Sequence, residues 1–446
     1  MLDDMIDHVG SIRQQPVWQP VPESVRGAIR ENLPRRGAGV MEAYKTFRRL
    51  VLPYATGNLH PGFMGWVHGG GNVVGALAEI LAGMLNANLG GRDHAPIEIE
   101  RQVIRWSAEM FGLPREASGL LVTGTSMANM IAVLIARRHA LGPSVRQRGV
   151  GSAQMLAYGS AAIHGCIPRA LDMAGFGTDA LRRIPVDSAH RIDLNALEAS
   201  IRHDTATGAR PFMVVGNAGT VDIGATDDLK GMAEICARWK LWFHVDAAFG
   251  GFAILAPEFA PLLCGIERAD SIGFDFHKWG QVPYDAGCIL VRDRSHQFET
   301  FAQNADYLHR TTRGLAGGSP WPCDLGPDLS RSFRALKVWM TLKAYGLDAI
   351  GGAVAQCCRV ARYLAKRIDS EPKLERVAPV PLNIVCFRPR GMTDQECVGL
   401  VADVQESGMA APSTTKIDGR VAIRAAIVNH RTTEADADRL LEAVLR

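Results

Sequence analysis

The sequence lacks several features that would place the chain in a specialised class of protein. Its 49 basic and 46 acidic residues nearly cancel to a formal net charge of +3, whereas nucleic-acid-binding proteins concentrate basic residues on one face or tail. The longest strongly apolar helical stretch, MIAVLIA at residues 130–136, is far too short to cross a bilayer. We therefore expect neither a nucleic-acid partner nor a membrane protein.

Cysteine is present but does not occur in closely spaced pairs. Nine cysteines, an odd number, are scattered along the chain without one Cys-x-x-Cys spacing. Neither a disulfide framework nor a zinc ribbon is predicted, and no metal site is expected. The first residues, MLDDMIDHVG, are acidic rather than basic and show no secretory signal. These observations predict a protein of the reducing cytoplasm.

The pattern along the chain predicts about two or three domains for its length. The pattern of residues 1–60 predicts helices interrupted by proline-rich turns. Between residues 100 and 300, short apolar runs alternate with helical stretches, which is typical of a mostly parallel sheet covered on both faces by helices. A long helix and a second alternation of helices and strands follow. We predict an N-terminal helical segment (1–60), a large domain (61–325) and a smaller α/β domain (326–446).

One candidate site lies in the stretch VTGTSMANM, where a predicted strand ends and a helix begins. Gly124 permits a tight turn there, and Thr125 and Ser126 stand at the helix start. Backbone N–H groups and hydroxyls at such a position favour an anion, most naturally a phosphate. Considered alone, the motif is explained equally well by an ordinary helix cap. The dinucleotide fingerprint G-x-G-x-x-G is absent.

Two further polar residues follow predicted strands, where binding sites in open α/β sheets form. Asp246 ends the apolar run WFHVD and precedes Ala247 and Ala248. A poorly solvated carboxylate needs a cationic partner, and the small alanines leave room for a flat object beside it. His164 follows the strand near residues 155–160, and its ring could stack on another ring. Taken singly, Asp246 could be a turn residue and His164 a packing residue.

The stretch SIGFDFHKWG places His277 and Lys278 directly after another apolar run. Lysine is almost never fully buried unless it is paired or used chemically, and a desolvated lysine is the residue type that forms Schiff bases with carbonyl compounds. A phosphate site, a buried aspartate, a stackable histidine and a strand-end lysine together describe a pyridoxal phosphate site. Each signal is weak alone, but their combination predicts this cofactor.

With these residues in place, the chain resembles the group II pyridoxal-phosphate-dependent decarboxylases, which include the aromatic amino acid and glutamate decarboxylases. The resemblance covers nearly the whole chain and rests on HPGFMGWVHGGG, HAPIEIERQVIRWSAEMFGLP, HVDAAFGG, ADSIGFDFHKWG, YDAGCILVRD and SFRALKVWM. It implies the fold-type I architecture, with a mostly parallel sheet in the large domain, and a homodimer with active sites at the subunit interface.

The resemblance also implies how the cofactor is held. Lys278 would carry the cofactor, Asp246 would pair with the pyridine nitrogen, and His164 would stack on the ring. Thr125 and Ser126 would meet the phosphate. The other residues placed near the cofactor in this way are Thr220, Ala248 and His277.

The reaction and its substrate are implied in the same way. Tyr307 in DYLHR matches a loop tyrosine that protonates the substrate carbon after CO2 leaves. Trp66, Val67 and His68 match a segment that lines the substrate pocket, and the glycines beside them leave space. We therefore expect decarboxylation of an L-amino acid to the amine, with an aromatic substrate favoured and acidic or diamino acids open.

The sequence departs from the family pattern at Asp275 and Phe276, where many relatives have Asn-Pro. An aspartate near a phosphate would be repelled unless it were protonated or turned away, so no phosphate contact is assigned to Asp275. The stretches VDIGATDDL and HKWGQVPYD also resemble the sphingosine-phosphate lyase branch, which leaves a carbon–carbon lyase as an alternative. An aldehyde-forming oxidative decarboxylase is disfavoured because Tyr307 is present. A non-catalytic relative is disfavoured because no cofactor position is missing.

Overall fold

The structure, a computed structural model, describes residues 1–303 and 311–446. These residues form two compact units, one of residues 71–355 and one that joins residues 1–70 to residues 356–446. The three-part division predicted from the sequence stays a prediction. Within the described residues, no helix is both long enough and apolar enough to span a membrane.

The unit of residues 71–355 is built on a seven-stranded sheet with the order β1-β7-β6-β5-β4-β2-β3. The strand β7 runs antiparallel to both neighbours, and the other pairs are parallel. The strands are β1 (Ser118–Val122), β2 (Met155–Ser160), β3 (Leu181–Ile184), β4 (Arg210–Asn217), β5 (Trp242–Asp246), β6 (Ser271–Asp275) and β7 (Gly287–Val291). The predicted mostly parallel sheet is confirmed.

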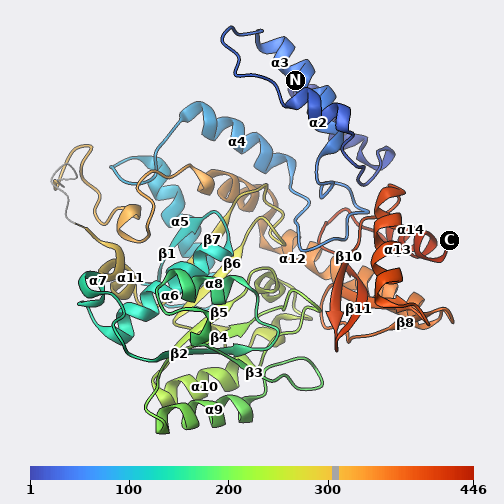
Figure 1. Cartoon of the computed structure of the whole chain (residues 1–446). Helices are drawn as coiled ribbons and strands as arrows, with labels where there is room; N and C mark the ends of the chain where they lie inside the picture. The colour runs from blue at the N-terminus through green and yellow to red at the C-terminus, as the bar shows by residue number, and fades with distance from the viewer. Residues whose placement is uncertain (304–310) are drawn as a thin grey trace. The chain divides into compact units, whose positions relative to one another are not determined.

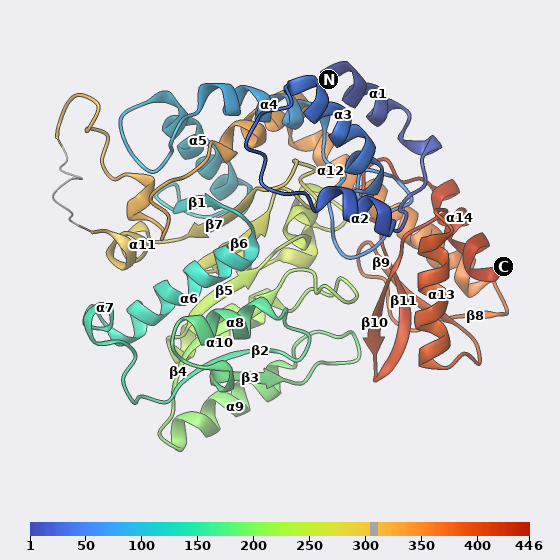
Figure 2. The ribbon, with the colours of Figure 1, turned by 45° about the horizontal axis from the view of Figure 1, so that its top comes forward.

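Helices cover both faces of this sheet (Figures 1 and 2). Val215 of β4 belongs to the apolar core formed with α6 and α8. A side chain on the next residue, Gly216, would instead meet Leu229 and Met232 of α10 at 2.9 and 3.1 Å. Since successive residues of a strand point to opposite faces, both faces are covered. The strands β5, β6 and β7 are buried at every position, which explains why their sequences are nearly continuous apolar runs.

The other elements of this unit complete the layers around the sheet. Its α-helices are α4 (Val73–Leu85), α5 (Ala95–Met110), α6 (Thr125–Leu141), α7 (Val145–Arg148), α8 (Cys166–Met173), α9 (Leu194–Ala206), α10 (Leu229–Trp239) and α11 (Arg294–Phe301). Short 3-10 turns are η3 (Thr178–Ala180), η4 (Gly250–Leu255), η5 (Ala260–Leu263), η6 (Ile266–Arg268) and η8 (Pro322–Asp324). The long predicted helix is α12 (Arg334–Asp369), which is interrupted at Gly346 (φ 73°) and continues past residue 355.

The other unit contains an antiparallel sheet of order β10-β11-β9-β8. Its strands are β8 (Leu374–Arg376), β9 (Ile384–Pro389), β10 (Ser413–Ile417) and β11 (Arg420–Ala426). Its helices are α1 (Leu2–Gly10), η1 (Ile12–Gln14), α2 (Glu23–Ile29), α3 (Val40–Leu50), η2 (Leu52–Tyr54), α13 (Asp394–Glu406) and α14 (Glu434–Leu445). Met64 joins the early segment to this sheet, because its N–H donates to Ala411 O (2.9 Å) and its carbonyl accepts from Ala426 N–H (2.8 Å).

Candidate active site

The residues predicted to follow strand ends meet at one edge of the large sheet. Asp246 ends β5 and Asp275 ends β6, three residues before Lys278. The turn after β1 reaches the same edge, because the backbone N–H of Thr125 donates to Asp275 Oδ1 at 2.7 Å. The carboxyl edge of the parallel strands therefore brings together the helix start, the aspartates and the lysine.

Lys278 is held by Asp275. The lysine Nζ lies 2.9 Å from Asp275 Oδ2, and the side chains are 22% and 2% exposed. Burial opposes the lysine charge, but the Asp275 carboxylate outweighs it and raises the pKa of Lys278 above its ordinary value. Asp275 is thus turned toward the lysine and the helix start, and its two oxygens are occupied there.

Asp246 is a buried carboxylate with few partners. It is 5% exposed, and it accepts hydrogen bonds from Asn129 Nδ2 at 2.8 Å and from the Ala248 N–H at 3.1 Å. Burial raises the pKa of Asp246, although Lys278 and these two donors oppose the rise. A cationic group placed against it would stabilise its ionised form, which is what a protonated pyridine nitrogen offers.

The helix start at Thr125 has the donors that a phosphate needs. Gly124 is the N-cap of α6 and has no side chain with which to cap it. Thr125 is buried, and its Oγ1 has no hydrogen-bond partner among the described residues, while Ser126 is exposed. Gly287 lets β7 approach this turn, because a Cβ on it would lie 2.4 Å from Gly124 Cα.

His277 is fixed beside Lys278 by a backbone contact. It is 5% exposed, and its Nδ1 accepts the N–H of Ala286 at 3.0 Å, so the neutral ring carries its proton on Nε2. That atom lies 3.6 Å from Asp275 Oδ2. Burial lowers the pKa of His277, and Asp275 only partly offsets this. The ring therefore offers a neutral N–H donor at the site.

His164 and Thr220 follow the ends of β2 and β4. His164 is exposed, as stacking on a bound ring would require, and its Nδ1 accepts the N–H of Cys166 at 3.2 Å. The Cys166 thiol in turn lies 3.9 Å from Asp246 Oδ2, which links this loop to the aspartate. Thr220 is 3% exposed, and its Oγ1 accepts the Ala225 N–H at 3.1 Å.

The predicted substrate segment lies in the other unit, that of residues 1–70 and 356–446. Trp66 is 55% exposed and stacks on His68 with ring centres 5.9 Å apart. His68 also stacks on Phe63 at 5.7 Å, and Val67 is buried. Phe63, Trp66 and His68 thus form an aromatic cluster. Tyr307 lies outside the described residues.

Sequence reasoning missed three contributors to the site, namely Asn129, His244 and the ion pair of Asp275. Asn129 is a polar residue inside the apolar helical stretch ANMIAVLIA, and a buried amide must find partners. His244 stands two residues before Asp246, so both side chains point to the same face of β5. These two signals were readable from the sequence, whereas the direction of the Asp275 side chain was not.

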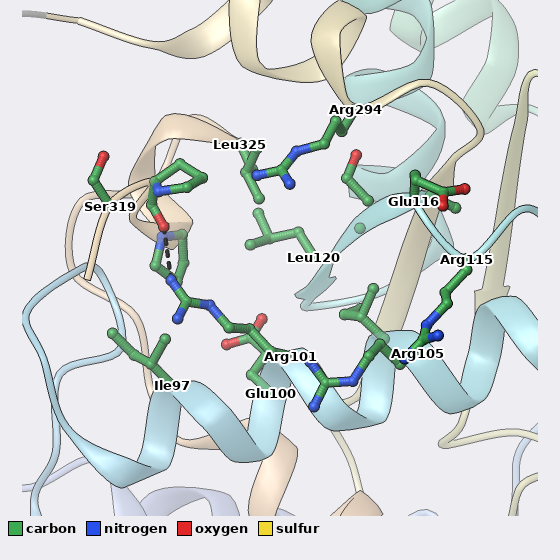
Figure 3. A pocket seen from close by; sticks show the side chains of 16 residues that line it. Ile97, Glu100, Arg101, Arg105, Arg115, Glu116, Leu120, Arg294, Ser319 and Leu325 are labelled. Atoms are coloured by element: carbon green, nitrogen blue, oxygen red, sulfur yellow. Dashed lines mark hydrogen bonds between the residues drawn. The ribbon is translucent and has the colours of Figure 1, made fainter.

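A separate hollow of about 320 Å³ lies where β1 begins (Figure 3). Four arginines line it, namely Arg101 and Arg105 of α5 together with Arg115 and Arg294. Arg101 is already engaged, because it donates to the carbonyls of Gly318 and Pro320 at 2.8 and 2.9 Å. Among the predicted site residues that the structure describes, none lines this hollow, and Lys278 and Asp246 lie elsewhere in the unit.

Comparison with known proteins identifies the class to which this site belongs. The family model "Pyridoxal-dependent decarboxylase conserved domain" matches residues 22–390. An aromatic-L-amino-acid decarboxylase of Bacillus atrophaeus is 33% identical, over 97% of this chain and 90% of its own length. An L-2,4-diaminobutyrate decarboxylase of Rhizobium meliloti (strain 1021) is 32% identical, over 95% and 85%. A crystal structure of Oryza sativa TDC with PLP and tryptamine superposes with a TM-score of 0.91 and 25% identity, covering 100% of this chain and 95% of that one.

The chain belongs to the pyridoxal-dependent decarboxylase family. It is a fold-type I enzyme that uses pyridoxal phosphate to decarboxylate amino acids, a carboxy-lyase, as the sequence predicted. The residues present fit this cofactor. The unpartnered buried hydroxyl of Thr125 is available to a phosphate, and the buried carboxylate of Asp246 is available to a protonated ring nitrogen.

Proposed function

We propose that this enzyme converts an aromatic L-amino acid to its amine and CO2. The observation that carries the proposal is the meeting of Lys278, the buried Asp246 and the helix start at Thr125 on one edge of the sheet. The aromatic choice is supported by the Bacillus relative and by the cluster of Phe63, Trp66 and His68, whose flat rings suit a flat substrate side chain. The Rhizobium relative makes a diamino acid the second candidate.

Each residue of the site has a proposed task. Lys278 holds the cofactor covalently, and Asp246 holds a proton on the pyridine nitrogen. His164 stacks on the ring, and Thr125 donates to the phosphate. The remaining proposed cofactor contacts are Ser126, Thr220, Ala248 and His277, and those to the substrate are Trp66, Val67 and His68.

When bound, pyridoxal phosphate supplies a ring that accepts the electron pair left on Cα as CO2 departs. The protein would determine which bond breaks by the way in which it orients the substrate carboxylate. Asp246 stays beside the nitrogen as an anion, because a buried positive charge is stable only when it is paired. Tyr307 is proposed to deliver a proton to Cα after CO2 has left.

The experiment that tests the proposal is a screen of L-amino acids with the purified enzyme. Release of CO2 and of the amine is measured for phenylalanine, tyrosine, tryptophan, 2,4-diaminobutyrate and glutamate. We expect kcat/KM to be highest for one of the three aromatic substrates. A preference for 2,4-diaminobutyrate or glutamate would overturn the aromatic assignment, and aldehyde formed by carbon–carbon cleavage without CO2 would indicate the lyase alternative.

We further propose a cytoplasmic homodimer. Helix α4 exposes a run of large apolar side chains, among them Leu81 (51% exposed), Met84 (83%) and Leu85 (59%), and apolar patches of this kind mark protein interfaces. A second copy of the chain is the proposed occupant. No disulfide joins any two of the nine cysteines, all of which lie among the described residues, and this suits a reducing compartment. Light scattering should give a dimer, and Leu81→Arg should give a monomer with little activity. A fully active monomeric parent would overturn the dimer.

A further inference from the structure

Behind Asp246 lies a line of buried polar side chains, and the proposed chemistry assigns a task to none of its members except Asp246. Its members are Asp246, Asn129, His244, Ser271 and Trp242, and we call them the buried polar network. Asn129, His244 and Ser271 are fully buried, and the two end members are 5% and 4% exposed. A fully buried polar group is stable only when it is hydrogen-bonded, so each contact in this network carries information about where the protons lie.

The contacts form a line with one side branch, the Cys166 thiol, whose Sγ lies 3.1 Å from Asn129 Nδ2. Asn129 Nδ2 donates to Asp246 Oδ2 at 2.8 Å, and Asn129 Oδ1 lies 2.8 Å from His244 Nε2. The other ring nitrogen, His244 Nδ1, lies 2.9 Å from Ser271 Oγ. Trp242 Nε1 donates to the same Oγ at 2.9 Å. Every distance lies in the normal range for a hydrogen bond.

An ionised Asp246 fixes the proton positions along the line, because a carboxylate can only accept and an indole N–H, at the other end, can only donate. Ser271 Oγ accepts from Trp242, which leaves the serine hydrogen free to donate to His244 Nδ1. The imidazole then carries its own hydrogen on Nε2 and donates it to the Asn129 oxygen. Burial lowers the pKa of His244 to about 3, which keeps the ring neutral. The Asn129 amide is left to donate to Asp246, so every hydrogen bond points toward the carboxylate.

The opposite arrangement requires a different charge on Asp246. If the Asn129 amide were reversed, its oxygen would face a carboxylate oxygen at 2.8 Å, and two acceptors repel each other unless one of them holds a proton. A protonated Asp246 would satisfy that arrangement. His244 Nδ1 would then donate to the Ser271 carbonyl, which lies 3.2 Å away. The tautomer of His244 is therefore tied to the charge of Asp246.

The sequence builds this line from two strands and one helix. Trp242, His244 and Asp246 alternate along β5, so they share a face of the sheet. His244 lies beside Ser271 in the parallel register of β5 and β6. Gly273 of β6 makes room for Asn129, because a Cβ at that position would lie 2.8 Å from Asn129 Oδ1.

We propose that Asn129 and His244 are positioning residues that hold Asp246 in its ionised form and thereby keep the ring nitrogen of the cofactor protonated. Burial alone works against the Asp246 anion, and the aligned donors of the buried polar network oppose that effect. Hydrogen bonds in such a line strengthen one another. The inference rests on the proposed pairing of Asp246 with the ring nitrogen.

The test compares Asn129→Leu and His244→Phe, which break the line, with His244→Gln, whose amide restores a donor toward Asn129. Each full-length variant is loaded with 15N-labelled pyridoxal phosphate, and the nitrogen chemical shift reports whether the ring is protonated. We expect a protonated nitrogen in the parent and in His244→Gln, and a shift toward the unprotonated form in the other two. Loss of a hydrogen bond to a charged group should also weaken cofactor binding by about 10- to 100-fold in Asn129→Leu.

Tyr158→Phe is the matched control, because it removes a buried 2.9 Å hydrogen bond to Asp204 in the same unit. It should leave the nitrogen shift at its parental value. A protonated nitrogen in both Asn129→Leu and His244→Phe would overturn the inference. Asp246→Asn tests the proposed role of Asp246 separately from that of the buried polar network. A ring nitrogen that stays protonated in this variant would overturn the proposed role of Asp246 itself.

A second measurement needs no variant of the network to fold. In the cofactor-free parent labelled with 15N-histidine, we expect the His244 ring to stay neutral with its proton on Nε2 between about pH 5 and 8. Selective labelling of Phe–His pairs with 13C and 15N limits the candidate signals to His244 and His277, and the signal that remains in His277→Gln is that of His244. Proton placement on Nδ1 of His244 throughout this range would overturn the inference.

Discussion

The Nζ atom of Lys278 lies 2.9 Å from Oδ2 of Asp275, in a pair of which the carboxylate is almost fully buried. The ion pair therefore keeps the lysine that is proposed to carry the cofactor protonated, as an ammonium ion. An ammonium ion is not a nucleophile, so attachment of the cofactor requires that Lys278 give up this proton. Asp275 thus sets the pH at which the protein can take up its cofactor.

Asp275→Asn should make cofactor attachment faster at neutral pH. Because Asp275 raises the pKa of Lys278, its loss lowers that pKa and enlarges the fraction of neutral amine at every pH below it. The rate should rise about tenfold for each unit by which the pKa falls. Stopped-flow absorbance of cofactor-free protein mixed with pyridoxal phosphate, followed from about pH 6 to 9, measures this. A pH profile identical to that of the parent would show that Asp275 does not control the lysine.

Lys278→Ala should abolish turnover and covalent attachment of the cofactor. Borohydride reduction followed by mass spectrometry should find the cofactor linked to the parent but not to this variant. Lys337→Met is the matched control, because Lys337 is also buried and pairs with Glu79 at 2.6 Å. Its removal leaves only a half-exposed carboxylate, and labelling should persist. Cofactor still linked to the Lys278→Ala protein would refute the assignment.

Asp246→Asn should leave the cofactor bound and the enzyme nearly inactive. The amide cannot balance a proton on the ring nitrogen, so the ring accepts electrons poorly. We expect kcat to fall by well over the tenfold that corresponds to about 1.4 kcal/mol of barrier, with cofactor content unchanged by absorbance. A smaller loss of kcat at full cofactor content would argue against the pairing.

The same substitution should stabilise the cofactor-free protein. Burial raises the pKa of Asp246 in the folded chain above its unfolded value. A carboxyl shifted in this direction favours the unfolded state once the pH exceeds the unfolded pKa, near about 3.9. Cofactor-free Asp246→Asn should therefore have the higher Tm at pH 7, and the difference should shrink as the pH falls toward about 4. A lower Tm than the parent at pH 7 would contradict this.

The sequence predicted those parts of the molecule that depend on local pattern. Apolar runs predicted the strands β1, β2, β5 and β6, and the carboxyl-edge rule placed Thr125, Asp246 and Lys278 together. It did not predict that Asp275 pairs with Lys278, because side-chain direction at a strand end depends on the helix start that β1 brings to it. The line from Trp242 to Asp246 was missed for a similar reason, since Asn129 meets His244 only across the packed helix and sheet.

Tyr307 provides the prediction that separates the decarboxylase from its alternatives. It stands 29 residues after Lys278 in the sequence (307 − 278), and its proposed task is to deliver the proton to Cα. Tyr307→Phe keeps the ring and removes only the hydroxyl. CO2 release should continue, but amine formation should fall by about 10²- to 10⁴-fold, the usual effect of losing a general acid.

In air, the unprotonated substrate carbon of the Tyr307→Phe enzyme should react with O2 instead. The products would be the aldehyde, ammonia and hydrogen peroxide, and anaerobic conditions should suppress them. The measurement is the ratio of amine to aldehyde for parent and variant on the preferred substrate, with Tyr345→Phe as a control tyrosine from α12. Because only proton delivery to Cα links the hydroxyl to this ratio, an unchanged ratio at an unchanged rate would place Tyr307 outside the chemistry.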